Sequence, residues 1–266
     1  MSWNIERQET PDHVVVVTMN TNPVNAQNPT FFDDLHACFD RLESDYEDCA
    51  VVLRGQGSTF SAGLDLEHHF PLFASRDVAA IEEWLSAFQT TNMRIFTYPR
   101  PTVAAVNGNA FAGGLLTALS CDYRIGVDAD VQIGLNEVQI GMPFPATYVE
   151  IIRYATGVHS ITPATLFGRV YDPSEAREVG YLHELTAPDD LTDRAVEVAG
   201  SIDPTCFAAY AFTKQAFQNP VLDAVERFGG PLDQSDFETA VSDSGSTTAH
   251  ARQYEAVSGN EPHWEY

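Results

Sequence analysis

In the first half of the chain, short runs of apolar residues alternate with longer segments whose apolar residues would fall on one face of a helix. The β-branched run Val14–Met19 predicts a strand, and the shorter runs Ala50–Leu53, Thr102–Val106 and Tyr123–Val127 predict three more. Glycine-containing sequence follows two of these runs, and helical patterns lie between the strands. Strands that alternate with helices in this way indicate an α/β domain.

Two of the helical patterns are long. In the first, Asn28 suits the N-cap and Pro29 the first turn of a helix that runs over residues 30–44. The second covers residues 77–97 and is stopped by the sequence YPRP at 98–101, because a residue that precedes proline is pushed out of the helical region. Each pattern places its apolar side chains on one face, which we expect to pack against the strands.

The second half of the chain is different in character, because strand signals become sparse after about residue 145. Helices are predicted near residues 147–156, 160–167, 174–179, 189–201, 204–218 and 234–252. We therefore divide the chain into an α/β core over residues 1–203 and a C-terminal helical region over residues 204–266. No internal repeat or low-complexity linker is visible.

The charge is unusual for a chain of this length. Across 266 residues, 14 Lys and Arg oppose 38 Asp and Glu, which gives a net charge of −24, and Lys214 is the single lysine. Affinity for nucleic acid and for anionic membranes comes from clusters of basic residues, so both partners are excluded as general ligands. Because the acids are spread along the whole chain, they predict an acidic globular surface.

The remaining global signals are weaker. No apolar stretch approaches the length of a membrane span, and the N-terminus has no signal-peptide order. The four cysteines, Cys38, Cys49, Cys121 and Cys206, have no CxxC spacing. We expect reduced thiols in a cytoplasm, without a metal site.

Two glycine-containing loops are candidates for a ligand site. One is Phe60-Ser-Ala-Gly-Leu-Asp-Leu66, after a predicted strand, and the other is Asn107-Gly-Asn-Ala-Phe-Ala-Gly-Gly114, between a strand and a helix. Glycine lets a backbone approach a ligand closely, and free N–H groups at a helix start favour an anion. Taken alone, the loops fit either two tight turns or two N–H donors aimed at one oxyanion. Neither has the spacing of a nucleotide-binding loop.

Individual acids and histidines leave more than one interpretation open. Glu137 lies among apolar neighbours in Gly134–Gly141, where it could be a base with a raised pKa or an ordinary surface or capping acid. His68 and His69 are adjacent, so their side chains point apart, and no third metal ligand is evident. The stripe Phe144, Tyr148 and Ile151 reads as core. No serine has the flanking glycines of a hydrolase nucleophile.

Taken in order, four segments resemble the crotonase (enoyl-CoA hydratase/isomerase) superfamily over most of the chain. Val14–Asn25 resembles its first strand and turn, and Phe60–Leu66 resembles its first oxyanion loop. Arg100–Asp122 resembles its signature segment, and Gly134–Gly141 resembles the stretch that carries its second catalytic acid. The resemblance implies a core of repeated ββα turns, a helical C-terminal region that serves oligomerisation, and homotrimers or hexamers.

The resemblance also implies the chemistry of the site. The substrate would be an acyl-CoA thioester whose carbonyl oxygen accepts hydrogen bonds from the N–H groups of Leu64 and Gly113. Coenzyme A would be part of the substrate, and neither a metal nor another cofactor would be needed. Other residues implied to contact the substrate are Ala62, Gly63, Asp65, Leu66, Gly114, Leu116 and Phe144.

The subfamily depends on two acid positions. Hydratases carry two glutamates that together activate a water, but this chain has Leu116 at the first position and an acid, Glu137, only at the second. One carboxyl group can still move a proton between two carbons. This pattern resembles 3,2-trans-enoyl-CoA isomerases, which implies conversion of a 3-enoyl-CoA into the 2-trans isomer used in β-oxidation.

Three features depart from the family or leave alternatives open. After the first loop the chain has Glu67-His68-His69, where relatives often carry lysine or a small polar residue. Lys214 matches a position where the family often has a lysine near the CoA phosphates, with Arg76, Arg94 and Arg100 as alternatives. The other hypotheses are hydration, hydrolysis or decarboxylation through Asp65, Glu150 or a histidine, and an acyl-CoA-binding protein without catalysis.

Overall fold

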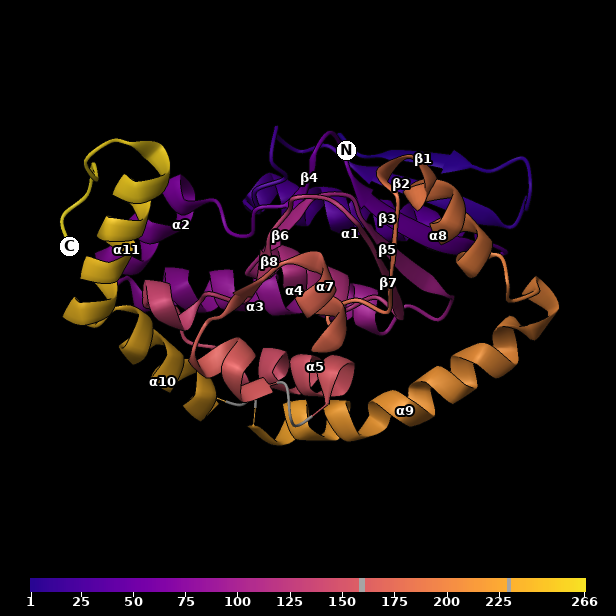
Figure 1. Cartoon of the computed structure of the whole chain (residues 1–266). Helices are drawn as coiled ribbons and strands as arrows, with labels where there is room; N and C mark the ends of the chain where they lie inside the picture. Colours follow the sequence, from indigo (N-terminus) through magenta and orange to yellow (C-terminus); the bar gives the residue numbers. More distant parts are fainter. Residues whose placement is uncertain (158–160, 229–230) are drawn as a thin grey trace.

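Two β-sheets of mainly parallel strands form the centre of the molecule (Figure 1). The computed structural model describes residues 1–157, 161–228 and 231–266. Within these residues, the larger sheet has the order β1-β2-β3-β5-β7-β10 and the smaller has the order β4-β6-β8-β9. The larger sheet comprises β1 (Asn4–Arg7), β2 (Val14–Met19), β3 (Ala50–Gly55), β5 (Thr102–Val106), β7 (Tyr123–Val127) and β10 (Glu184–Thr186). The smaller comprises β4 (Thr59–Ser61), β6 (Asn109–Phe111), β8 (Ile133–Gly134) and β9 (Val170–Tyr171).

The chain visits the two sheets alternately, and this produces the expected ββα turns. β3 is followed by β4 and then by helices α2 (Leu66–Ser75) and α3 (Val78–Phe96). β5 and β6 lead into α4 (Gly113–Leu119), and β7 and β8 lead through the short helix η1 (Val138–Ile140) into α5 (Ala146–Thr156). β2 pairs in parallel with β3, β3 with β5, and β5 with β7, so the ends of successive turns lie side by side.

The larger sheet is buried on both faces, which explains the continuous apolar strands. In β2, Val15 and Val17 belong to the main hydrophobic core, whereas Val14 and Val16 pack into a second cluster with α8 (Leu191–Ala199). Successive side chains of a strand point to opposite faces, so four consecutive valines satisfy two cores.

The long predicted helices are confirmed. Asn28 is the N-cap of helix α1 (Pro29–Asp45), and its Oδ1 accepts a hydrogen bond from Phe31 N at 3.1 Å. Helix α3 ends at Phe96, just before the YPRP segment. In both helices the buried side chains fall on one face, as the sequence pattern predicts.

The second half is mainly helical, with two differences from prediction. It contains the π-helical turn Thr162–Leu166, α7 (Pro173–Glu178), η3 (Pro188–Asp190), α8, η4 (Pro204–Cys206), α9 (Phe207–Phe228), α10 (Pro231–Val241) and α11 (Ser244–Ser258). Helix α9 continues through Pro220, beyond its predicted end at 218. The single helix predicted over 234–252 is two helices, because Asp243 caps α11 through Gly245 N at 2.8 Å. Residue 160, the predicted start of the 160–167 helix, lies outside the described residues.

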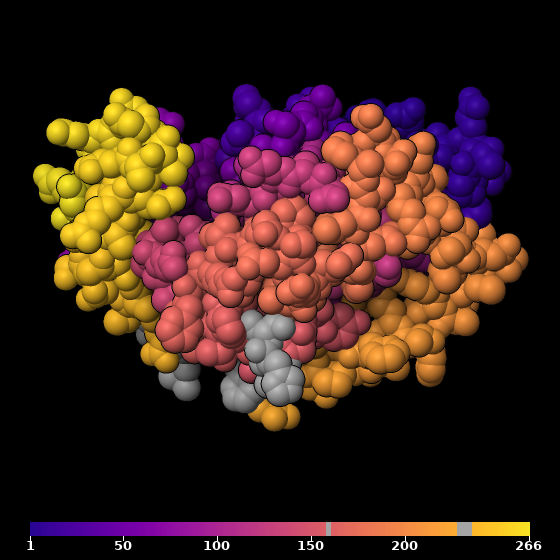
Figure 2. Space-filling view, in the orientation of Figure 1, coloured from indigo at the N-terminus to yellow at the C-terminus, as the bar shows by residue number. Residues whose placement is uncertain are grey.

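The C-terminal helices wrap around the core (Figure 1). Helix α9 lies against α5, and the chain then returns through α10 to α11, which packs against α2 and η1. Figure 2 shows this last segment, in yellow, as one edge of the molecule. The wrapping matters for function because it brings the end of the chain beside loops from its first half. No helix in the described residues is long and apolar enough to cross a membrane.

Candidate active site

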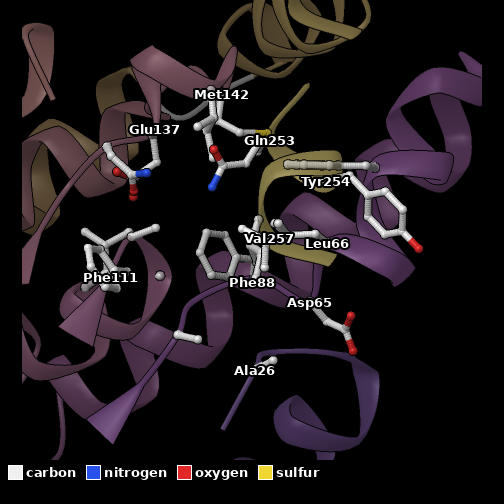
Figure 3. Close-up of a pocket in the computed structure, with 18 of the residues that line it drawn as sticks. Ala26, Asp65, Leu66, Phe88, Phe111, Glu137, Met142, Gln253, Tyr254 and Val257 are labelled. Atoms are coloured by element: carbon white, nitrogen blue, oxygen red, sulfur yellow. The ribbon is translucent and has the colours of Figure 1, made fainter. Parts of the chain in front are cut away.

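A pocket of about 630 Å³ lies where the two glycine-containing loops, η1 and α11 meet (Figure 3). Glu137 and Gln253 lie on one side of it, and Ala26 and Asp65 on the opposite side. The structure brings most of the predicted site residues to this one pocket: Ala62, Leu64, Asp65, Leu66, Gly113, Leu116, Glu137 and Phe144 all line it.

The two glycines that do not line the pocket hold the loops together behind it. Gly63 has φ +82°, and a Cβ added there would lie 2.7 Å from Phe111 O and 3.2 Å from Gly113 N. A Cβ on Gly114 would lie 2.3 Å from Ser61 O. Real side chains do not tolerate such approaches to backbone atoms, so both positions need glycine for the two loops to pack backbone to backbone.

The two predicted oxyanion donors, the Leu64 and Gly113 N–H groups, are free. Within the described residues, neither group donates a hydrogen bond. Gly113 is the first residue of α4, where helical N–H groups have no partner inside the helix. Ala112 before it has φ 47° and ψ −125°, an uncommon conformation for a residue with a side chain. The backbone is thus shaped to present two adjacent donors to the pocket.

Glu137 is a buried carboxyl group without a partner. It is 7% exposed, and neither carboxylate oxygen has a hydrogen-bond partner within the described residues. Burial raises the pKa of Glu137 from 4.5 to about 8. Its backbone is well fixed, because Glu137 O accepts hydrogen bonds from Ile140 N at 3.0 Å and Met142 N at 2.8 Å. A rigid turn therefore presents a carboxyl group that can be either protonated or ionised near neutral pH.

The rest of the lining is mainly apolar. Leu116, at the position where hydratases carry their first acid, is 2% exposed and faces the same pocket as Glu137. Trp84, Phe88 and Phe237 add aromatic walls. The charged residues of the lining, Asp65, Glu67 and Glu137, are all acidic. The pocket thus suits an apolar chain with a polar group that accepts hydrogen bonds from the Leu64 and Gly113 N–H groups.

A network of buried, hydrogen-bonded polar groups contacts the first turns of α4. The Thr117 hydroxyl lies 3.1 Å from Gly113 O and 3.3 Å from Asn92 Oδ1. Asn92 Nδ2 donates to the Tyr148 hydroxyl at 3.0 Å, which donates in turn to Phe88 O at 2.8 Å. Buried polar groups that satisfy one another in this way rigidify their surroundings. The network therefore holds the start of α4, including Gly113, in one position.

Helix α11 contributes residues that the sequence did not point to. Gln253, Tyr254, Val257 and Ser258 of the helix line the pocket, and so does Asn260 just past its end. The C-terminal region was assigned to oligomerisation, and nothing in this stretch resembles a motif. The only available signal was the spacing of Tyr254 and Val257 on one helix face, which is equally typical of packing.

The structure argues against the predicted role of Lys214. Its side chain is buried in α9, and its Nζ lies 2.8 Å from Asp122 Oδ1 and 2.9 Å from Asp122 Oδ2. Asp122 also accepts from Thr102 N at 2.9 Å, so the ion pair joins α9 to the larger sheet. Lys214 does not line the pocket. A buried lysine paired with a partly buried carboxylate is not available to a CoA phosphate.

The alternative catalytic groups are placed less favourably than Glu137. Glu150 forms an ion pair with Arg153 and does not line the pocket. His69 is fully buried, and burial lowers its pKa to about 4, so its ring is neutral at neutral pH. Asp65 lines the pocket as the N-cap of α2, where its Oδ2 accepts from Asn28 Nδ2 at 3.3 Å. Within the described ranges, no group of three or more His, Cys, Asp and Glu side chains is placed to hold a metal ion.

Comparisons with known proteins agree with this geometry. Residues 9–252 match the family model described as enoyl-CoA hydratase/isomerase. A putative enoyl-CoA hydratase of Thermus thermophilus is 33% identical over 76% of this chain and 79% of its own length. The mitochondrial enoyl-CoA delta isomerase 1 of Mus musculus is 31% identical over 71% of this chain and 65% of its own length.

Solved structures point the same way. The crystal structure of human mitochondrial delta3-delta2-enoyl-CoA isomerase superimposes with a TM-score of 0.87 at 25% identity and covers 97% of this chain and 99% of that one. Both hydratases and isomerases are therefore among the relatives. This chain belongs to the enoyl-CoA hydratase/isomerase (crotonase) family of acyl-CoA enzymes.

Proposed function

We propose that this enzyme converts 3-enoyl-CoA into 2-trans-enoyl-CoA, with Glu137 as the single acid and base. The observation that carries the proposal is that Glu137 and Leu116 line one pocket. The Glu137 carboxyl group is buried and has no hydrogen-bond partner among the described residues, and an apolar side chain stands where a second acid would be needed to activate water. One carboxyl group suffices for a proton shift between two carbons.

The reaction is balanced without a cofactor. The ionised Glu137 removes a proton from C2 of the substrate, and the electron pair of that C–H bond spreads over C2, C3 and C4 and the thioester oxygen as a dienolate. The protonated Glu137 then returns the proton to C4, which leaves the double bond between C2 and C3. A carboxyl pKa of about 8 favours both halves of this cycle, because neither protonation state is strongly disfavoured near neutral pH.

The dienolate needs stabilisation at its oxygen. The free N–H groups of Leu64 and Gly113 are placed in adjacent loops, and donors fixed in advance lose no energy to reorganisation when the charge forms. Removal of one such donor typically lowers kcat by about a hundred- to a thousandfold. These two groups supply the larger part of the rate enhancement in this proposal.

The proposal is tested with a panel of CoA esters. The purified enzyme is incubated separately with 3-enoyl-CoA and 2-enoyl-CoA esters of several chain lengths, and the products are separated and identified by mass and by double-bond position. We expect isomerisation of the 3-enoyl esters and little addition of water to the 2-enoyl esters. Dominant hydration, hydrolysis or decarboxylation would contradict the proposal, as would binding without turnover of any ester.

We also propose that the enzyme acts as a homotrimer or a hexamer. Several large apolar side chains are exposed on the single chain, among them Leu166, Phe167, Phe212 and Phe217. Exposed apolar side chains of this size are typical of surfaces that associate. Sedimentation equilibrium at several protein concentrations measures the assembly, and a mass of one 29.2 kDa chain at all concentrations would contradict it.

A further inference from the structure

Gln27 occupies an unusual place between the two loops of the site. It lies between β2 and α1, where the first turn of the fold has one bridging residue instead of a strand of the smaller sheet. The residue is 1% exposed. Burial of a polar side chain costs free energy unless its polar atoms form hydrogen bonds, so the hydrogen bonds of Gln27 indicate its role.

The backbone of Gln27 holds the first loop on both sides of Leu64. Gln27 N donates to Gly63 O at 2.7 Å, and Asp65 N donates to Gln27 O at 3.0 Å. In a parallel bridge of this kind, the residue between the two bonds points its own N–H away from the partner chain. The bridge to Gln27 therefore turns the Leu64 N–H outward from the bridge.

The side chain of Gln27 holds the second loop. Its Nε2 donates to Gly113 O at 3.1 Å and to Thr117 Oγ1 at 2.9 Å, both in the first turns of α4. The fit is tight, because a Cβ added to Gly113 would lie 2.3 Å from Gln27 Oε1. Gly113 is thus held through its own carbonyl group and by the close packing of Gln27 Oε1, and this fixes the residue whose N–H group faces the pocket.

A third contact fixes Gln27 itself. His69, fully buried in α2, places its Nε2 2.7 Å from Gln27 O, and as a neutral ring it donates this hydrogen bond. Gln27 O thus accepts from Asp65 N and from His69, so the bridging residue cannot shift without breaking both.

We propose that Gln27 is the positioning residue for both oxyanion donors, with its backbone orienting the Leu64 N–H and its side-chain amide orienting the Gly113 N–H. The inference rests on the proposed function, since it assumes that these two groups bind the thioester oxygen. It adds that their relative position is set by one residue that touches neither the substrate nor the reacting atoms.

The test replaces the amide without changing the size of the side chain. Q27M keeps the backbone bridge to the first loop but removes both hydrogen bonds to α4. The matched control is Q218M, because Gln218 is also buried, at 3% exposed, and donates from Nε2 to Phe96 O away from the pocket. Octanoyl-CoA labelled with ¹³C at the carbonyl is bound to each protein, and infrared difference spectra report how strongly the carbonyl is polarised.

We expect the wild type and Q218M to shift the carbonyl band equally to lower frequency, and Q27M to show less than half of that shift. For isomerisation, kcat of Q27M should fall by about ten- to a hundredfold while KM changes by less than about threefold, because a misplaced donor weakens transition-state binding more than ground-state binding. A full carbonyl shift and a kcat like that of Q218M would overturn the inference.

Two further outcomes are decisive. If the wild type binds the ester without any carbonyl shift, the oxyanion site itself is wrong and the inference falls with it. If Q27M does not fold, T117V replaces it, because this change removes the hydroxyl that accepts from Gln27 Nε2 and keeps the shape of the side chain. A reduced shift in T117V supports the inference, and an unreduced one overturns it.

Discussion

At the scale of single residues, the site depends on the burial of one carboxyl group away from water. Glu137 has no compensating hydrogen bond or cation within the described residues, so its ionised form is disfavoured and its pKa rises to about 8. The same burial that suits it to the proposed role of base weakens the fold, because the unfolded chain ionises this group far more easily.

Because burial of the ionisable Glu137 side chain destabilises the fold, we predict that E137Q is more stable than the wild type near neutral pH. Below pH 4.5 the carboxyl group is protonated in both folded and unfolded chains, so the two proteins should be equally stable. As the pH rises towards 8, only the unfolded wild type ionises, and its free energy of unfolding falls. At pH 7 the difference should be about 3 kcal/mol, from 1.36 kcal/mol per pKa unit. Urea unfolding at several pH values measures it, and a pH-independent difference would contradict the assignment.

The same pKa predicts the pH dependence of the reaction. Only ionised Glu137 can remove the C2 proton, so kcat/KM should rise about tenfold per pH unit below pH 8 and level off above it. The measurement is the initial rate at substrate concentrations below KM, between pH 5.5 and 9.5. A profile that levels off near pH 5 would mean that a carboxyl group with an ordinary pKa is the base.

At the scale of elements, the site is made where loops from consecutive turns touch. α4 begins with two glycines, and Gly114 packs against Ser61 O at the end of β4. Helix propensity alone predicts that G114A stabilises α4 by about 1 kcal/mol. The clash of the added Cβ with Ser61 O predicts instead that G114A lowers the free energy of unfolding by about 1–3 kcal/mol. Thermal and urea unfolding decide between them, and a stabilised G114A would show that the two loops are not in contact.

The sequence predicted the elements whose burial pattern is long enough to read. α1, α3, β2, β5 and β7 were predicted because their apolar residues repeat over five or more positions and their ends carry capping residues or prolines. β4, β6 and β8 are two or three residues long, so they have no readable period and exist only because they pair with one another. α11 was predicted as a helix, but its place in the pocket depends on the path of α9 and α10, which no local pattern encodes.

The sequence likewise predicted some residues of the candidate site and not others. Leu64, Gly113 and Glu137 were found because they lie in segments that resemble a family. Gln27 was not found, since its importance comes from contacts to residues 36 and 86 positions away. Lys214 was predicted to lie near the CoA phosphates because its sequence position matched, whereas the structure pairs its ammonium group with Asp122.

At the scale of the whole molecule, the surface and the substrate have the same sign of charge. The chain has a net charge of −24, the charged side chains that line the pocket are acidic, and CoA carries several phosphate charges. The mean field of the protein therefore opposes binding of the substrate, and salt screens such a field. The screening length is about 30 Å at 0.01 M salt and about 8 Å at 0.15 M.

We expect KM for an enoyl-CoA ester to fall as ionic strength rises from 0.01 M to 0.5 M. The matched control is the same acyl group on pantetheine, which has no phosphate, and its KM should not change with salt. Steady-state kinetics with both esters provide the measurement. A KM for the CoA ester that rises with salt would mean that local cations, rather than the mean field, dominate recognition of the phosphates.

In the proposed reaction, Glu137 alone moves the proton from C2 to C4. The most direct measurement is the rate of 2-trans-enoyl-CoA formation from a 3-enoyl-CoA by the wild type, E137Q and E238Q, since Glu238 is a second buried glutamate, at 8% exposed, that does not line the pocket. We predict that E137Q loses at least about a thousandfold in kcat while it still binds the ester, and that E238Q retains wild-type kcat within about threefold. Near-normal turnover by E137Q would show that a group other than Glu137 moves the proton.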